Sequence, residues 1–223
     1  MGWFFKTFRS SIGKKFSVAM TGFFLISFLI VHTGINALIF YNDGGETFNK
    51  AAHFMGTNPI IRTIEIFLVI GILLHIIQSI LLWRFNRAAR PIGYAMEKPI
   101  PKVTWYSKSM TLLGTLILMF LIVHTSNFWI PNRTHQFIHG EELPLYQMML
   151  QKFSNPIEVT IYLLGILSLF WHLLHGFSSA FQSLGINHRK YNFLMRFSGR
   201  IFSFIICLTL AMMPISIFLK WIQ

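Results

Sequence analysis

Five long stretches without a charged side chain constrain this sequence more than any other feature. They cover residues 16–42, 66–83, 109–132, 159–188 and 201–219. A helix of about 20 apolar residues is long enough to cross the hydrocarbon core of a bilayer. Charged residues make up only 12% of the chain, against about 25% in an ordinary soluble domain, so lipid is the expected solvent.

These stretches predict an all-α membrane protein in which residues 1–223 form one domain of five transmembrane helices, the first four of them forming a bundle. The first stretch is too long for the apolar part of a cleavable signal peptide, so we expect it to stay in the membrane. The predicted helices cover residues 15–40, 59–84, 106–130, 157–184 and 198–220.

The basic residues are distributed unevenly between the two sides of the predicted membrane. Of the 19 Lys and Arg, four precede the first helix, six lie between the second and third helices, and four lie between the fourth and fifth. By the positive-inside rule, this asymmetry predicts a cytoplasmic N-terminus and an external C-terminus. Membrane topology therefore explains the net charge of +12, and nucleic-acid binding is not expected. The single cysteine, Cys207, excludes an intrachain disulfide and a Cys-x-x-Cys-His attachment for c-type haem.

An internal repeat links the first and third helices. Residues 28–33 and 120–125 share the sequence Phe-Leu-Ile-Val-His-Thr, which contains His32 and His124. A glycine stands ten residues before each histidine. Repeated elements of this kind occupy equivalent places in a fold, so the two histidines are expected at the same level of the bundle.

A second repeat links the second and fourth helices. Asn-Pro-Ile starts both of them, at Asn58 and Asn155, and proline is tolerated in the first turn of a helix. A histidine follows the asparagine by 17 residues in each case, at His75 and His172. The equal spacing selects His172 over its neighbour His175 as the counterpart of His75.

The direction of each helix determines how deep its histidine lies in the membrane. The first and third helices run outward, and the second and fourth run inward. His32 and His124 lie about 25 Å from the cytoplasmic start of their helices, and we call them the outer pair. His75 and His172 lie about 14–18 Å from the cytoplasmic face, and we call them the inner pair. Two level pairs on four helices are the arrangement that two stacked bis-histidine haem groups require.

Haem chemistry suits these residues. A neutral imidazole nitrogen on each side binds iron without adding charge to a low-dielectric interior. We therefore predict that the outer pair and the inner pair each ligate the iron of one haem b. The flat macrocycle needs small residues beside it, which we expect at Gly71 and Gly165, on the same helical faces as His75 and His172. Ser168 is expected to accept a hydrogen bond from the second ring nitrogen of His172.

Two further residues keep alternative interpretations. His175 lies one turn beyond His172 and can bond either a haem propionate or a neighbouring helix. Glu65 lies one to two turns inside the second helix, where a carboxyl group is costly unless it faces protein or water. It is a candidate for proton exchange at a quinone site, or it forms an ion pair with Arg62.

The start of the second predicted helix, residues 51–67 (Ala-Ala-His-Phe-Met-Gly-Thr-Asn-Pro-Ile-Ile-Arg-Thr-Ile-Glu-Ile-Phe), resembles the cytochrome b subunit of dihaem succinate dehydrogenases. Five helices with histidines on the first four match that family, and residues 87–91 (Arg-Ala-Ala-Arg-Pro) resemble its Bacteroidetes-type branch. The resemblance implies a subunit of the bacterial cytoplasmic membrane. It also implies an anchor for a flavoprotein subunit with covalent FAD and an iron–sulfur subunit, both on the cytoplasmic side.

The resemblance further implies electron transfer from succinate, through FAD and iron–sulfur clusters, to the inner haem, the outer haem and a quinone, expected to be menaquinone. This chain itself would carry no dehydrogenase site, and its basic segment 84–108 is the expected docking rim. Some dihaem fumarate reductases carry a glutamate two residues before the fourth ligand, where this chain has Phe170. A proton route through such a carboxyl group is therefore not expected, and the physiological direction stays open.

Two other classes of protein also stay open. A dihaem cytochrome b that anchors a hydrogenase or a formate dehydrogenase shares transmembrane bis-histidine haems. A small proton-coupled transporter with a histidine relay is the non-redox alternative, although the repeated patterns here lie in parallel rather than inverted helices. The partner subunit and the absorption spectrum distinguish these classes.

Overall fold

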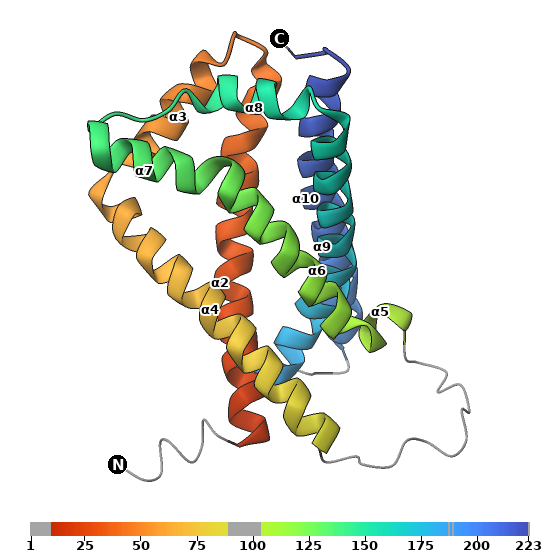
Figure 1. Ribbon diagram of the computed structural model, residues 1–223. Helices are drawn as coiled ribbons and strands as arrows, with labels where there is room; N and C mark the ends of the chain where they lie inside the picture. The colour runs from red at the N-terminus through yellow and green to blue at the C-terminus, as the bar shows by residue number, and fades with distance from the viewer. Residues whose placement is uncertain (1–9, 89–103, 187, 189, 223) are drawn as a thin grey trace.

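The computed structural model describes residues 10–88, 104–186, 188 and 190–222, and the regular elements within these ranges are all helical (Figure 1). Five of its spans are long and apolar enough to cross a membrane, which confirms the predicted fold class. In chain order, the spans consist of α2 (Ser11–Ala37) with a 3₁₀ turn (Leu38–Tyr41), α4 (Pro59–Ala88), α6 (Met110–His124) with a π-helical turn (Thr125–Trp129) and α7 (Ile130–His139), α9 (Pro156–Ser183), and α10 (Asn192–Phe218).

Short helices complete the fold. Two of them, α3 (Glu46–Thr57) and α8 (Leu145–Phe153), lie across the end of the bundle that also carries the C-terminus, and we call this the cap end (Figure 1). The start of α2 and the short helix α5 (Trp105–Lys108) lie at the opposite end, which we call the N-terminal end. The largest buried apolar cluster lies beneath the cap and includes Phe48, Tyr146 and Tyr162.

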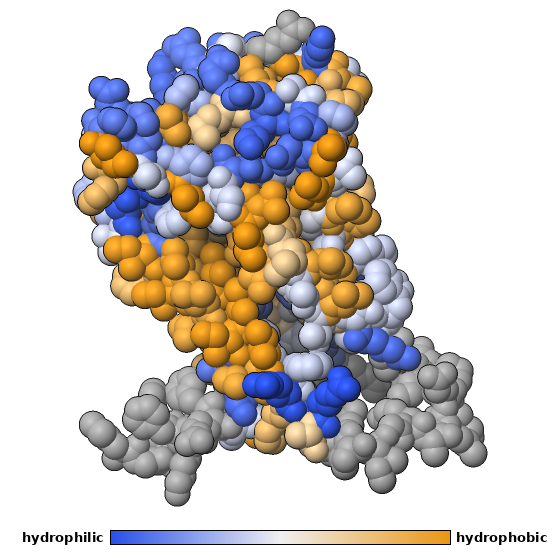
Figure 2. Space-filling model, viewed as in Figure 1, coloured by the Kyte–Doolittle hydropathy of each residue, from blue (hydrophilic) through white to orange (hydrophobic). Residues whose placement is uncertain are grey.

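Apolar side chains cover the outside of the spans. Ile66, Leu112 and Leu164, on three different helices, are all exposed, and Figure 2 shows a broad hydrophobic belt between two polar ends. Lipid tails are as apolar as these side chains, so their exposure is not penalised as it would be in water. The outward-facing belt is what a bilayer-embedded bundle requires.

Helix packing places α9 at the centre of the bundle. It packs against α10, α6 and α2, and α2 in turn packs against α4. The two Asn-Pro sequences begin α4 and α9 in the same way. Asn58 Oδ1 accepts a hydrogen bond from the N–H of Ile60 at 3.0 Å, and Asn155 Oδ1 accepts one from Ile157 at 2.9 Å. Such bonds satisfy backbone donors that a helix start leaves unpaired.

The third span differs from its prediction. It was expected to end at residue 130, but α7 continues it to His139, because the charge at Arg133 ends the apolar stretch without ending the helix. A π-helical turn also interrupts it at Thr125–Trp129. Pro131 follows that turn, lacks the N–H that would bond the carbonyl group four residues earlier, and would crowd it in a regular α-helix. The wider turn relieves this conflict.

Candidate functional site

The outer pair is assembled from α2 and α6. The imidazole rings of His32 and His124 have centroids 5.7 Å apart and planes at 90°. Phe28 stacks on His32 and Phe120 stacks on His124, each from one turn earlier in its own helix. The repeated sequence thus supplies each histidine with the same aromatic neighbour.

The inner pair is assembled from α4 and α9. The rings of His75 and His172 have centroids 6.4 Å apart and planes at 69°. Gly22 and Gly114, the glycines of the first repeat, lie beside these rings: a Cβ added to Gly22 would lie 3.6 Å from His75 Cε1, and one added to Gly114 would lie 3.9 Å from His172 Cε1. Since each glycine precedes its outer histidine by ten residues, the two pairs are separated by about 15 Å along the helices.

The spacing of both pairs suits a metal ion held between two imidazoles. A histidine nitrogen lies about 2.0–2.1 Å from a bound divalent metal ion, so two imidazoles on opposite sides of one ion have centroids roughly 6 Å apart. The observed 5.7 and 6.4 Å agree with this span. The Nδ1 atoms of His124 and His172 are buried and lack a hydrogen-bond partner among the described residues. Buried polar atoms are normally paired, so these two rings retain bonding capacity that a ligand site can use.

The other two imidazoles are contacted by polar side chains. Thr21 Oγ1 lies 3.0 Å from His75 Nδ1, and Asn36 Nδ2 lies 3.4 Å from His32 Nδ1. Neither contact was predicted. The sequence offered one signal for the contact of Thr21, because Thr21 immediately precedes Gly22, the glycine of the first repeat. Gly22 stands ten residues before His32, and this spacing did not indicate that Thr21 would contact His75.

Gly71 and Gly165 face aromatic rings. A Cβ added to Gly71 would lie 2.9 Å from Phe24 Cδ1, and one added to Gly165 would overlap the ring of Phe120. Both glycines therefore allow close approach between neighbouring helices. Their expected contact with a porphyrin stays a prediction.

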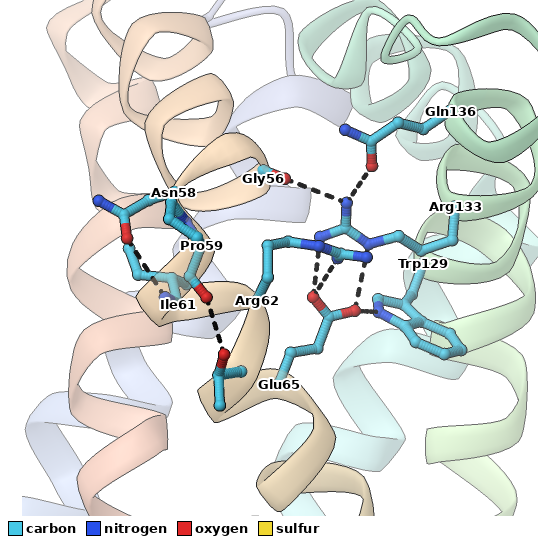
Figure 3. A network of polar contacts seen from close by, with 10 residues as sticks. Gly56, Asn58, Pro59, Ile61, Arg62, Glu65, Trp129, Arg133 and Gln136 are labelled. Atoms are coloured by element: carbon cyan, nitrogen blue, oxygen red, sulfur yellow. Dashed lines mark hydrogen bonds and ion pairs between the residues drawn. The ribbon is translucent and has the colours of Figure 1, made fainter.

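Glu65 lies at the centre of a polar network that joins α4 to the third span (Figure 3). Its carboxylate accepts hydrogen bonds from Arg62, from Trp129 Nε1 at 2.5 Å, and from Arg133, whose Nη2 and Nε lie at 2.9 and 3.1 Å. Arg133 also donates to Gln136. The expected ion pair with Arg62 is therefore present, and Arg133 is a second cationic partner that the sequence did not indicate. The quinone role of Glu65 stays a prediction.

Ser168 does not act as expected. Its hydroxyl group donates to the backbone carbonyl group of Leu164 at 3.0 Å, and His172 Nδ1 has no hydrogen-bond partner in the described part of the chain. The predicted bond between them is wrong, because a serine within a helix commonly bonds the carbonyl group one turn earlier. His175 is half-buried one turn beyond His172, and its two alternative roles stay open.

Comparison with known proteins gives one distant relative. The chain is 27% identical over 184 residues to the succinate dehydrogenase cytochrome b558 subunit of Bacillus subtilis (strain 168), and the alignment covers 82% of this chain and 80% of that protein. No protein-family model and no solved structure matches the chain. The chain is therefore similar to that subunit over most of the length of both proteins.

Proposed function

We propose that this chain is the membrane-anchor and electron-transfer subunit of a succinate:quinone oxidoreductase, and that it holds two haem b groups. The observation that carries the proposal is the meeting of four histidines from four helices in two facing pairs. The name of the Bacillus subtilis relative favours succinate dehydrogenase over a hydrogenase or a formate dehydrogenase as the parent complex.

In this proposal, His32 and His124 hold the outer haem, and His75 and His172 hold the inner haem. Each pair offers two nitrogen ligands, and the described residues contain no group of three or more His, Cys, Asp or Glu able to hold a metal ion. One imidazole from each histidine of a pair would be sufficient to hold a haem b, because the porphyrin would supply the remaining nitrogen ligands. A bound haem b supplies a one-electron carrier.

The helices contribute position and surroundings. The two pairs stand about 15 Å apart along the bundle, which spaces two redox centres across the membrane. The rings of Phe28 and Phe120 stack on the outer imidazoles. Glu65 is the quinone-site candidate, with menaquinone as the expected quinone. In that role its carboxylate has to exchange arginine contacts for a proton, so its function requires the network of Figure 3 to open.

Charge supports an orientation with the N-terminal end in the cytoplasm. Each acidic side chain that the structure describes lies toward the cap end, where ion pairs join Lys50 to Glu46, Lys152 to Glu158, and both arginines to Glu65. The described cations of the N-terminal end have no acidic partner among the residues that the structure describes, and an excess of Lys and Arg marks cytoplasmic segments. These cations are Lys14, Lys15, Arg84, Arg87, Lys108, Lys190, Arg196 and Arg200.

The flavoprotein and iron–sulfur subunits are then expected to bind the N-terminal end, which brings electrons in at the inner pair. Most of the predicted docking rim, residues 89–103, lies outside the described residues. Arg84, Arg87 and Lys108 flank it, and Arg87 lies over the Trp83 ring at 5.6 Å.

Purification of the native complex tests the proposal. We expect a flavin-containing partner, an iron–sulfur partner, succinate-dependent reduction of a b-type absorption band, and two haems for each copy of this chain. A nickel- or molybdenum-containing partner would contradict the assignment to a succinate:quinone oxidoreductase. The assignment of this chain as a cytochrome b would still stand. A complex without a b-type band would overturn the cytochrome itself and would favour the histidine-relay transporter.

A further inference from the structure

Thr21 and His75 form a polar contact between the first and second spans. Thr21 Oγ1 lies 3.0 Å from His75 Nδ1, 2.8 Å from the carbonyl oxygen of Ser17 and 3.1 Å from that of Val18. All three distances are within hydrogen-bonding range. The hydroxyl group thus has two backbone acceptors on its own helix and one imidazole nitrogen on its neighbour.

The distances favour one arrangement of the protons in this cluster. A threonine hydroxyl group has one proton, and its shortest contact, 2.8 Å, is with the carbonyl oxygen of Ser17, one turn earlier, the bond that a threonine within a helix commonly forms. The hydroxyl oxygen keeps lone pairs that accept. The contact with His75 is then a hydrogen bond only if the Nδ1–H of His75 donates to Thr21. In a neutral imidazole, Nε2 consequently carries the free lone pair.

The second half of the molecule lacks this contact. Gly114 stands beside His172 as Gly22 stands beside His75. The residue before Gly22 is Thr21, whereas the residue before Gly114 is Leu113, which is buried. An apolar side chain offers no acceptor, and His172 Nδ1 has no hydrogen-bond partner among the described residues. The inner pair therefore combines one oriented imidazole with one that is not oriented in this way.

We propose that Thr21 is a positioning residue of the inner site, holding His75 in the tautomer that presents Nε2 to iron and strengthening that nitrogen as a donor. The role of Thr21 toward iron rests on the proposed function. The hydrogen bond between Thr21 and His75 rests on the described contacts alone. A hydrogen bond from the second ring nitrogen fixes ring orientation and raises ligand basicity. A more basic ligand favours ferric over ferrous iron, so Thr21 lowers the potential of the inner haem.

Thr21→Val keeps the shape of the side chain and removes the hydroxyl acceptor, while the carbonyl group of Val18, which also interacts with His75, is unchanged. In the purified complex we expect the potential of the inner haem to rise, by about 59 mV for each tenfold loss of preference for ferric iron. Haem affinity is expected to fall roughly 10- to 100-fold, as for other outer-shell partners of metal ligands. Thr21→Ser restores the hydroxyl group and should restore both values.

Two further variants complete the test, one as a matched control and one that adds the missing contact to His172. Thr115→Val makes the same change at an exposed threonine of α6 whose hydroxyl group bonds only the backbone of its own helix, at Thr111, and should change neither value. Leu113→Thr offers His172 the acceptor that it lacks and should lower the potential. The inference would be overturned if Thr21→Val changed neither the potential nor the haem content, or if Thr115→Val shifted the potential equally. Neither outcome would contradict the proposed function or the presence of two haems.

A nitrogen NMR spectrum of the haem-free chain, labelled at its histidine nitrogens, tests the hydrogen bond independently of haem. His53 and His135 should also be protonated at Nδ1, because their Nδ1 atoms lie 2.9 Å from a carboxylate oxygen of Glu142 and from the carbonyl oxygen of Glu141. We expect a further Nδ1-protonated histidine, His75, which alone loses that signature in Thr21→Val and keeps it in Thr21→Ser. Spectra that are identical in all three chains would overturn the inference even if the chain is not a cytochrome.

Discussion

The imidazole rings of His32 and His124 face each other across the bundle at 5.7 Å, with planes at 90°, although they belong to the first and third spans. His75 and His172 are related in the same way at 6.4 Å. If each pair holds one haem iron, replacing either histidine of a pair should remove the same haem. The absorption component that is lost then shows which two histidines form a pair.

His32→Ala and His124→Ala should therefore lose the same haem component, because bis-histidine iron needs both axial ligands. His75→Ala and His172→Ala should both lose the other component. Haem content and low-temperature spectra of the four purified variants measure this. Loss of different components within one pair would contradict the pairing.

His172 and His175 should differ in their effects. Only His172 faces His75, so His172→Ala should lose the inner haem and His175→Ala should retain both. The haem-to-polypeptide ratio of each variant gives the result. Retention of both haems in His172→Ala would show that the 17-residue spacing selects the wrong histidine.

Glu65→Gln should destabilise the cap side of the bundle. It leaves Arg62 and Arg133, with side chains 39% and 18% exposed, without their carboxylate, at a cost of about 2 kcal/mol. Unfolding in detergent measures the loss. The control is Glu46→Gln, whose ion pair with Lys50 is exposed on both sides and should contribute less than about 0.5 kcal/mol. Equal effects of the two changes would rule out a structural role for the network.

Gly165→Ala should weaken the contact between α9 and α6, because the added methyl group overlaps the Phe120 ring. Overpacking of this kind costs about 1–3 kcal/mol. Phe120 also stacks on His124, so the absorption of the outer haem should change with it. Gly34→Ala is the control, since no atom lies within 4 Å of its added Cβ, and it should stabilise α2 by about 0.5–1 kcal/mol. A stabilising Gly165→Ala would contradict the packing described for Phe120.

Asp43 should make the start of α3 sensitive to acid. Its carboxylate accepts hydrogen bonds from the N–H of Thr47 at 2.9 Å and of Gly45 at 3.1 Å, and these bonds, chiefly with Thr47, lower its pKa. A lowered native pKa means that stabilisation is complete above the unfolded value of about 3.9 and is lost as the pH falls through the native pKa. Amide shifts of Gly45 and Thr47 should titrate below the ordinary aspartate range. Asp43→Asn should abolish the titration, and a midpoint at or above that range would contradict the prediction.

The five spans and the two histidine pairs could be predicted because they follow from the length of apolar stretches and the spacing of repeats along the sequence. The five spans follow from apolar length, and the meeting of His32 with His124 and of His75 with His172 follows from repeats with equal spacing. The capping helices α3 and α8 were missed. They are short and amphipathic, and they form because packing beneath the cap buries Phe48 and Tyr146, not because of apolar length.

The sequence by itself determined how many times the chain can cross a bilayer and which histidines share a level, because burial in lipid and helical rise depend on residue type and count alone. Only the tertiary structure decided which polar groups meet between helices. Arg133 reaches Glu65, Thr21 contacts His75, and Ser168 bonds its own helix instead of His172. These choices depend on helix crossing, on the π-helical turn and on side-chain rotamers, which place atoms to within an ångström and leave no periodic signal in the sequence.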